Sequence, residues 1–122
     1  MLGFVGLKIL RIVSRFLARF LDFVLNMEED EMNKRVHVMI SGHVQGVWFR
    51  ANTKRKAEDL GITGWVKNTE DGKVEAVFEG NEDDIQKMIS WCHTGSESSR
   101  VTNVGVQYQD FTDEFDRFQI VH

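Results

Sequence analysis

The sequence contains no proline and only one cysteine, Cys92, among its 122 residues. A single cysteine excludes an intramolecular disulfide and is typical of proteins in a reducing, intracellular compartment, so we expect a cytoplasmic protein. Without proline, the ends of helices and strands must be marked by glycine, asparagine and aspartate. Such residues occur at Gly61, Asp71-Gly72 and Gly80-Asn81, which predicts turns or helix ends at these positions.

The sequence also lacks an excess of basic residues. Fifteen lysines and arginines stand against nineteen acidic residues, which gives a net charge of −4. Four of the cations, Lys8, Arg11, Arg15 and Arg19, precede the first acidic residue, so the remainder of the chain is strongly acidic. Nucleic-acid binding depends mainly on clustered lysine and arginine. We therefore expect no nucleic-acid partner.

Residues 1–26 are mostly apolar, but these four cations interrupt them. Each cation would cost ~2.5 to 3.5 kcal/mol at the centre of a bilayer, which disfavours a transmembrane helix. At about 100° per residue, the cations fall within an arc of roughly 80° on a helix. This pattern predicts a basic amphipathic helix that binds a membrane surface or a protein partner. Two alternatives remain open: an organelle-targeting segment, or an upstream extension that is absent if translation begins at Met27 or Met32.

The rest of the chain predicts a short linker and one folded domain. Residues 27–33 are acidic and lack apolar periodicity, so we expect a solvated linker before a domain of residues 34–122. Apolar residues alternate in 35–41 and 74–78, and they recur at helical spacing from Phe49 to Leu60 and from Ile85 to Cys92. Further strands are expected at 62–68, 104–108 and 118–120, and Asn81 is placed to cap the second helix. The alternation also predicts that Glu75 and Glu79 face water.

This order of elements predicts an α/β sandwich of the ferredoxin-like type. It reads βαββαβ with an extra terminal strand, and two helices that follow strands in this way normally cover one face of a mostly antiparallel sheet. The fold alone does not identify an activity, because it carries enzymes, RNA-binding domains and small-molecule sensors. An RNA-binding domain is disfavoured, because the strand that would need basic and aromatic residues carries glutamates.

The segment "GHVQGVWFR", residues 42–50, contains two glycines immediately before a predicted helix. Flexible backbone at this position can direct several N–H groups, together with the positive end of the helix, toward one anion. Arg50 adds a planar guanidinium that can bind phosphate through two hydrogen bonds. The pattern therefore predicts a phosphate-binding loop. The alternative is an ordinary tight turn with a surface arginine.

Together with "GITGWVKNTEDGKVEAVFEG", residues 61–80, this loop resembles the acylphosphatase family over about residues 35–121. The resemblance implies that Arg50 is the catalytic arginine, that Asn68 orients the attacking water, and that no cofactor is needed. The phosphate would be bound by the loop residues His43, Val44, Gln45, Gly46 and Val47 together with Arg50. One departure is the absence of proline in "HTGSESSRVTNV", residues 93–104, where relatives commonly have a Gly-Pro turn.

The activity implied by the resemblance is hydrolysis of small acyl phosphates to a carboxylate and phosphate. A carboxylic acid of pKa ~4 to 5 leaves as a stable anion, so a general acid is not required. We expect direct attack of water on phosphorus. We expect no metal to take part, since the four histidines show no zinc-ligand spacing. A phosphate-binding module without turnover is the alternative. We expect Cys92, Trp48 and Trp65 to be packing residues, although the tryptophans could also shield the site or contact the acyl group.

Overall fold

The computed structural model describes residues 2–122, in two units divided between Met32 and Asn33. The first unit is one helix, α1 (Leu2–Met32). The linker expected over residues 27–33 is therefore wrong for residues 27–32, which continue this helix. The physical reason is that the stretch contains neither glycine nor proline, and glutamate and methionine favour helix. In the described chain, no helix has the length and apolar character needed to cross a bilayer.

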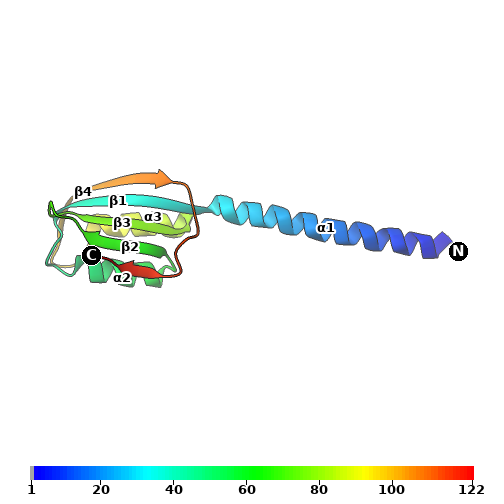
Figure 1. Ribbon diagram of the computed structural model, residues 1–122, viewed down its shortest axis with the longest axis horizontal. Coiled ribbons are helices and arrows are strands. Elements are labelled where there is room, and N and C mark those ends of the chain that lie inside the picture. The colour runs from blue at the N-terminus through cyan, green and yellow to red at the C-terminus, as the bar shows by residue number, and fades with distance from the viewer. Residues whose placement is uncertain (1) are drawn as a thin grey trace. The chain divides into compact units, whose positions relative to one another are not determined.

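The second unit is built on a five-stranded sheet in the order β4-β1-β3-β2-β5 (Figure 1). The strands are β1 (Asn33–His43), β2 (Thr63–Asn68), β3 (Val74–Asn81), β4 (Arg100–Gln109) and β5 (Phe118–Ile120). All neighbours pair antiparallel except β2 and β5, which are parallel. The ferredoxin-like architecture expected from the sequence is confirmed, and the extra terminal strand lies beside β2.

Two helices, α2 (Phe49–Asp59) and α3 (Glu82–Thr94), cover one face of this sheet (Figure 1). The alternating residues Val36, Val38 and Ile40 of β1 are fully buried beneath them. As predicted, Asn81 caps α3, because its side chain accepts a 2.9 Å hydrogen bond from the N–H of Asp84. The core thus lies between the sheet and the helices, and it holds the end of β1 and the start of α2 in place.

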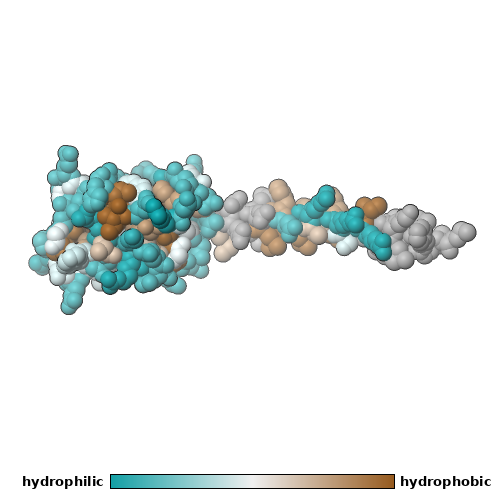
Figure 2. Space-filling model, turned by 60° about the horizontal axis from the view of Figure 1, so that its bottom comes forward, coloured by the Kyte–Doolittle hydropathy of each residue, from teal (hydrophilic) through white to brown (hydrophobic). Residues whose placement is uncertain are grey.

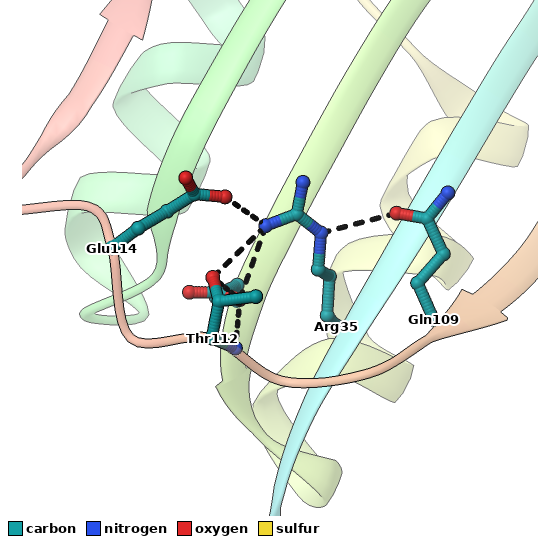
Figure 3. Close-up of polar contacts among 5 residues, drawn as sticks. Arg35, Gln109, Thr112 and Glu114 are labelled. Atoms are coloured by element: carbon teal, nitrogen blue, oxygen red, sulfur yellow. Dashed lines mark hydrogen bonds and ion pairs between the residues drawn. The ribbon is translucent and has the colours of Figure 1, made fainter.

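The opposite face of the sheet differs from the sequence prediction at Glu79, which is only 2% exposed. Its Oε2 accepts hydrogen bonds from the N–H and the hydroxyl of Thr112, and it lies 3.5 Å from Arg35. Arg35 also donates to Gln109 and Glu114, so one arginine joins β1 to the segment between β4 and β5 (Figure 3). The prediction that Glu79 faces water was wrong because this segment, which has no periodicity, crosses over its strand.

Candidate active site

The predicted phosphate-binding loop connects the end of β1 to the start of α2. At its first glycine, Gly42, the ladder between β1 and β4 shifts register. A Cβ atom there would lie 2.1 Å from the backbone oxygen of Arg100, so only glycine permits this close approach. Gly46 has φ +73°, a left-handed conformation that glycine adopts without strain. Gly42 therefore allows a close approach of two backbone segments, and Gly46 allows a left-handed backbone conformation.

The main-chain N–H groups of the loop have few partners in the protein. Among the hydrogen bonds of the described chain, none is donated by the N–H of Val44, Gln45, Gly46 or Val47. Such consecutive donors, next to the N-terminus of α2, form an environment that favours an anion. This geometry agrees with the phosphate-binding loop that the glycine spacing predicts.

The neighbouring segments hold this loop in place. The side chain of Val44 is buried in the core, and the buried hydroxyl of Ser96 donates a 2.7 Å hydrogen bond to the backbone oxygen of Val47. Ser96 lies in the segment where the family that the sequence resembles commonly has a Gly-Pro turn, and the hydroxyl of Ser99 donates a 2.7 Å hydrogen bond to the Ser96 backbone oxygen. Serine hydrogen bonds thus stabilise a turn for which the sequence offers no proline.

A cavity of about 510 Å³ opens beside the loop. Its walls come from the loop, the first turn of α2, the end of β2 and the C-terminal residues. The lining residues are Val44, Gly46, Trp48, Phe49, Arg50, Ala51, Asn68, Ile120 and His122. The volume is within the usual range for small-molecule sites.

Arg50 and Asn68, which are 18 positions apart in the sequence, line this same cavity. Arg50 is half-buried, and no ion pair among the described residues involves it. The Oδ1 of Asn68 is buried and has no hydrogen-bond partner. Since buried polar groups are nearly always paired, this atom is unusual and points to a role in binding. Rotation of the amide would exchange its oxygen and nitrogen, so either can face the cavity.

Four of the sequence-predicted site residues line the cavity: Val44, Gly46, Arg50 and Asn68. The other three do not. His43 ends β1 opposite Arg100 of β4, and the side chain of Gln45 donates to the backbone oxygens of Thr69 and Lys73. Val47 is buried. For Gln45 and Val47, any contact with phosphate would have to come from the main chain.

Trp48 lines the cavity and is 78% exposed. It is therefore not the packing residue that we expected first, and its position fits the alternative that it shields the site or contacts the acyl group. Its backbone has φ +63° and ψ +19°, a left-handed conformation that is strained for a bulky residue. An exposed aromatic ring held in a strained position beside a cavity suggests a binding role. Ile120 and His122 also line the cavity, and no motif in the sequence marked them.

Cys92 is fully buried on α3, and burial raises the pKa of its thiol to about 12. At neutral pH it is therefore an unreactive packing residue, as expected. No group of His, Cys, Asp or Glu side chains within the part of the chain that the structure describes is arranged to hold a metal ion. The polar groups at the cavity are main-chain N–H groups of the loop, the guanidinium of Arg50, the carboxamide of Asn68 and the imidazole of His122.

Comparison with protein families gives a match that covers most of the chain. The sequence model of the family described as Acylphosphatase matches residues 36–120. A protein named acylphosphatase from Syntrophobacter fumaroxidans is 56% identical over 87 residues, which is 71% of this chain and 90% of that protein. One from Pelotomaculum thermopropionicum is 49% identical and covers 70% of this chain and 94% of its own length.

Solved structures give the same result for the fold. An acylphosphatase from Coxiella burnetii superposes with a TM-score of 0.72 at 35% sequence identity, covering 76% of this chain and 97% of its own. An acylphosphatase from Bacillus subtilis has a TM-score of 0.71 at 35% identity, covering 73% of this chain and 99% of its own. The matched share of this chain is about the size of the second unit, residues 33–122.

Proposed function

Because the chain belongs to the acylphosphatase family and hydrolyses acyl phosphates, we propose that Arg50 and the main chain of residues 43–47 bind the phosphoryl group. In this proposal Asn68 orients the attacking water. The observation that carries it is that Asn68, whose buried amide oxygen has no hydrogen-bond partner, lines the same cavity as Arg50 and Gly46. The relatives' names do not favour the alternative of a binding module without turnover.

In the proposed reaction, no side chain of the protein forms a covalent bond with the substrate. Water attacks phosphorus, the bond between phosphorus and the acyl oxygen breaks, and the acyl group leaves as a carboxylate. A carboxylate is a stable leaving group, so no side chain has to protonate it. The loop N–H groups and Arg50 stabilise the charge on the phosphoryl oxygens. Asn68 accepts a hydrogen bond from the water and fixes its direction, and positioning of this kind supplies much of the rate in phosphoryl transfer.

The rest of the cavity supports a place for the acyl group. Beyond the polar residues, its wall is formed by apolar and aromatic side chains, among them Trp48, Phe49 and Ile120. The cavity of about 510 Å³ is larger than a phosphoryl group requires. We place the acyl part of a small acyl phosphate against this wall.

Two further parts of the proposal concern location and partners. We place the enzyme in the cytoplasm, where a buried, reduced thiol such as Cys92 is stable. We also infer that α1 attaches the enzyme to a membrane surface or a protein partner, because large apolar side chains along it are exposed.

The mechanism is tested by substitutions at Arg50 and Asn68 with benzoyl phosphate as substrate. Arg50→Ala should remove most activity, and Arg50→Lys should restore little, because an ammonium cannot form the paired hydrogen bonds of a guanidinium. Asn68→Ala should lower kcat more than it raises KM, since placing the water matters mainly in the transition state. Arg55→Ala, a change of the exposed arginine one turn later on α2, is the matched control and should retain activity.

Hydrolysis in ¹⁸O-labelled water tests the position of attack. The label should appear in inorganic phosphate, because water attacks phosphorus. Label in the carboxylate would show attack at the acyl carbon and would overturn the mechanism. An Asn68→Ala enzyme with unchanged kcat would overturn the role given to Asn68.

A further inference from the structure

Helix α1 carries a wide apolar surface that nothing else in its own unit covers. In residues 11–25, eight large apolar residues are between 47% and 69% exposed, and Val24 is less exposed. The eight are Ile12, Val13, Phe16, Leu17, Phe20, Leu21, Phe23 and Leu25. Exposed apolar surfaces of this extent mark interaction sites, because leaving them in water costs free energy.

The charged residues of this segment form a narrow stripe between the edges of the apolar surface. Arg11, Arg15 and Arg19 are exposed, and because they are four residues apart they lie on one side of the helix. Figure 2 shows a hydrophilic row along the described part of α1, with hydrophobic side chains on both sides of it. At about 100° per residue, the apolar side chains span an arc of roughly 220°.

We propose that α1 binds the surface of an anionic lipid bilayer, lying in the interface with its apolar side among the acyl chains. The arginine stripe would then contact lipid phosphates, because long cationic side chains can extend to the headgroups while their stems stay in apolar surroundings. The proposal concerns a surface separate from the catalytic cavity, and it does not depend on the mechanism proposed above.

Two observations favour lipid over a second copy of α1. The apolar arc of roughly 220° is wider than the seam that a pair of helices buries, which is two of every seven positions in a coiled coil. A second copy would therefore leave much of this surface in water, whereas a bilayer interface can cover it. The stripe carries Arg11, Arg15 and Arg19 against one acidic residue, Asp22, so it has a net positive charge that anionic headgroups complement. A second copy of α1 carries the same excess of positive charge and cannot neutralise it.

Flotation of the full chain with lipid vesicles tests the proposal. We expect the chain to float with vesicles containing about one third phosphatidylserine in phosphatidylcholine, and to float much less with pure phosphatidylcholine or at high salt. The triple variant Arg11→Gln, Arg15→Gln, Arg19→Gln should lower the partition coefficient on anionic vesicles on the order of a hundredfold. Phe16→Gln with Phe20→Gln should also reduce binding, by removing buried apolar area.

The matched control is Lys54→Gln, Lys56→Gln, Lys87→Gln, which removes the same charge from α2 and α3. This variant should float like the unaltered chain. Hydrolysis of benzoyl phosphate shows that each variant is folded, and flotation is read independently of hydrolysis. The proposal is overturned if the active full chain stays unbound on anionic vesicles, or if both triple variants lose binding equally. It is also overturned if light scattering shows a stable oligomer that Phe16→Gln with Phe20→Gln dissociates while vesicle binding is absent.

Discussion

The side-chain nitrogen of Gln45 donates a 2.8 Å hydrogen bond to the backbone oxygen of Thr69, the residue that follows Asn68. The same nitrogen donates a 2.9 Å hydrogen bond to the backbone oxygen of Lys73. These two bonds join the phosphate-binding loop to the turn between β2 and β3. We therefore expect Gln45 to act as a positioning residue, because its hydrogen bonds join the loop that would hold phosphate to the residue next to the amide that would hold water.

Replacing Gln45 with alanine should lower kcat several-fold and change KM less. The loop would keep its N–H groups, but its position relative to Asn68 would vary, and misplacement affects the transition state most. The loss of two part-buried hydrogen bonds should also lower the free energy of unfolding by about 1 to 3 kcal/mol. Steady-state kinetics and urea unfolding measure the two effects. Gln86→Ala, on the exposed side of α3, is the control, and an equal fall in kcat there would contradict the assignment.

Trp48 allows the strain of its backbone to be separated from the use of its ring. Trp48→Ala and Trp48→Gly both remove the ring, but only alanine retains the cost of φ +63°. The glycine variant should therefore be more stable than the alanine variant by about 1 kcal/mol. Urea unfolding of the two variants gives this difference directly. If the alanine variant were the more stable, the strain would be absent.

The same two variants should lose selectivity for the acyl group. If the ring contacts the acyl part, KM should rise several-fold for benzoyl phosphate and change little for acetyl phosphate, because the smaller acyl group offers less apolar area to the ring. The ratio of kcat/KM between the two substrates measures the effect. A parallel change for both substrates would mean that Trp48 affects the loop and not the acyl group.

The elements that the sequence predicted correctly are those whose signals are local. Alternation in β1, the helical spacing from Phe49 and the cap at Asn81 each depend on a few neighbouring residues. Val44, Gly46, Arg50 and Asn68 were placed by two motifs, and the fold brings both motifs to one cavity. In each case the structure that the neighbouring residues favour locally is also the one found in the complete fold.

The features that the sequence did not predict depend on contacts between distant segments. Glu79 is buried because residues near Thr112 cross over β3, and the period of β3 carries no information about that crossing. The contribution of Ile120 to the cavity requires β5 to pair with β2, which a three-residue strand does not reveal. For Trp48 we expected packing first because the residue is hydrophobic, and neither its exposure nor its positive φ is marked in the sequence.

The burial of Glu79 leads to a stability prediction. Glu79→Ala should lower the free energy of unfolding by about 2 to 4 kcal/mol, because it leaves the N–H of Thr112 and part of the Arg35 charge without their acceptor. Glu79→Gln retains an oxygen that can accept from Thr112 and should cost less. Urea unfolding measures the loss, and hydrogen exchange at Thr112 should accelerate in the alanine variant. A loss no larger than that of Glu114→Ala, a change at the exposed end of the same cluster, would contradict this account.

His37 and Glu75 form a pair on the same face of the sheet as Glu79. This pair predicts that the free energy of unfolding depends on pH. Their side chains lie 2.7 Å apart, and Lys67 lies 3.4 Å from the other oxygen of Glu75. The hydrogen bond from His37, with a smaller contribution from the charge of Lys67, lowers the pKa of Glu75 below its ordinary value of 4.5. Because the pKa is lower in the folded state, the carboxylate stabilises the fold above pH 4.5, and this contribution is lost as the pH falls through the lowered value.

Glu75→Gln should therefore reduce the free energy of unfolding by about 0.5 to 1 kcal/mol at pH 7, since the pair is only partly buried. The difference from the unaltered chain should shrink below pH 4.5, where Glu75 becomes protonated in the unfolded and then in the folded state. Urea unfolding at a series of pH values between neutrality and the acid limit measures this convergence. Glu58→Gln, at an exposed position on α2, should show no comparable difference. A Glu75→Gln deficit that stayed constant down to the lowest pH would mean that the carboxylate contributes through its shape and not through its charge.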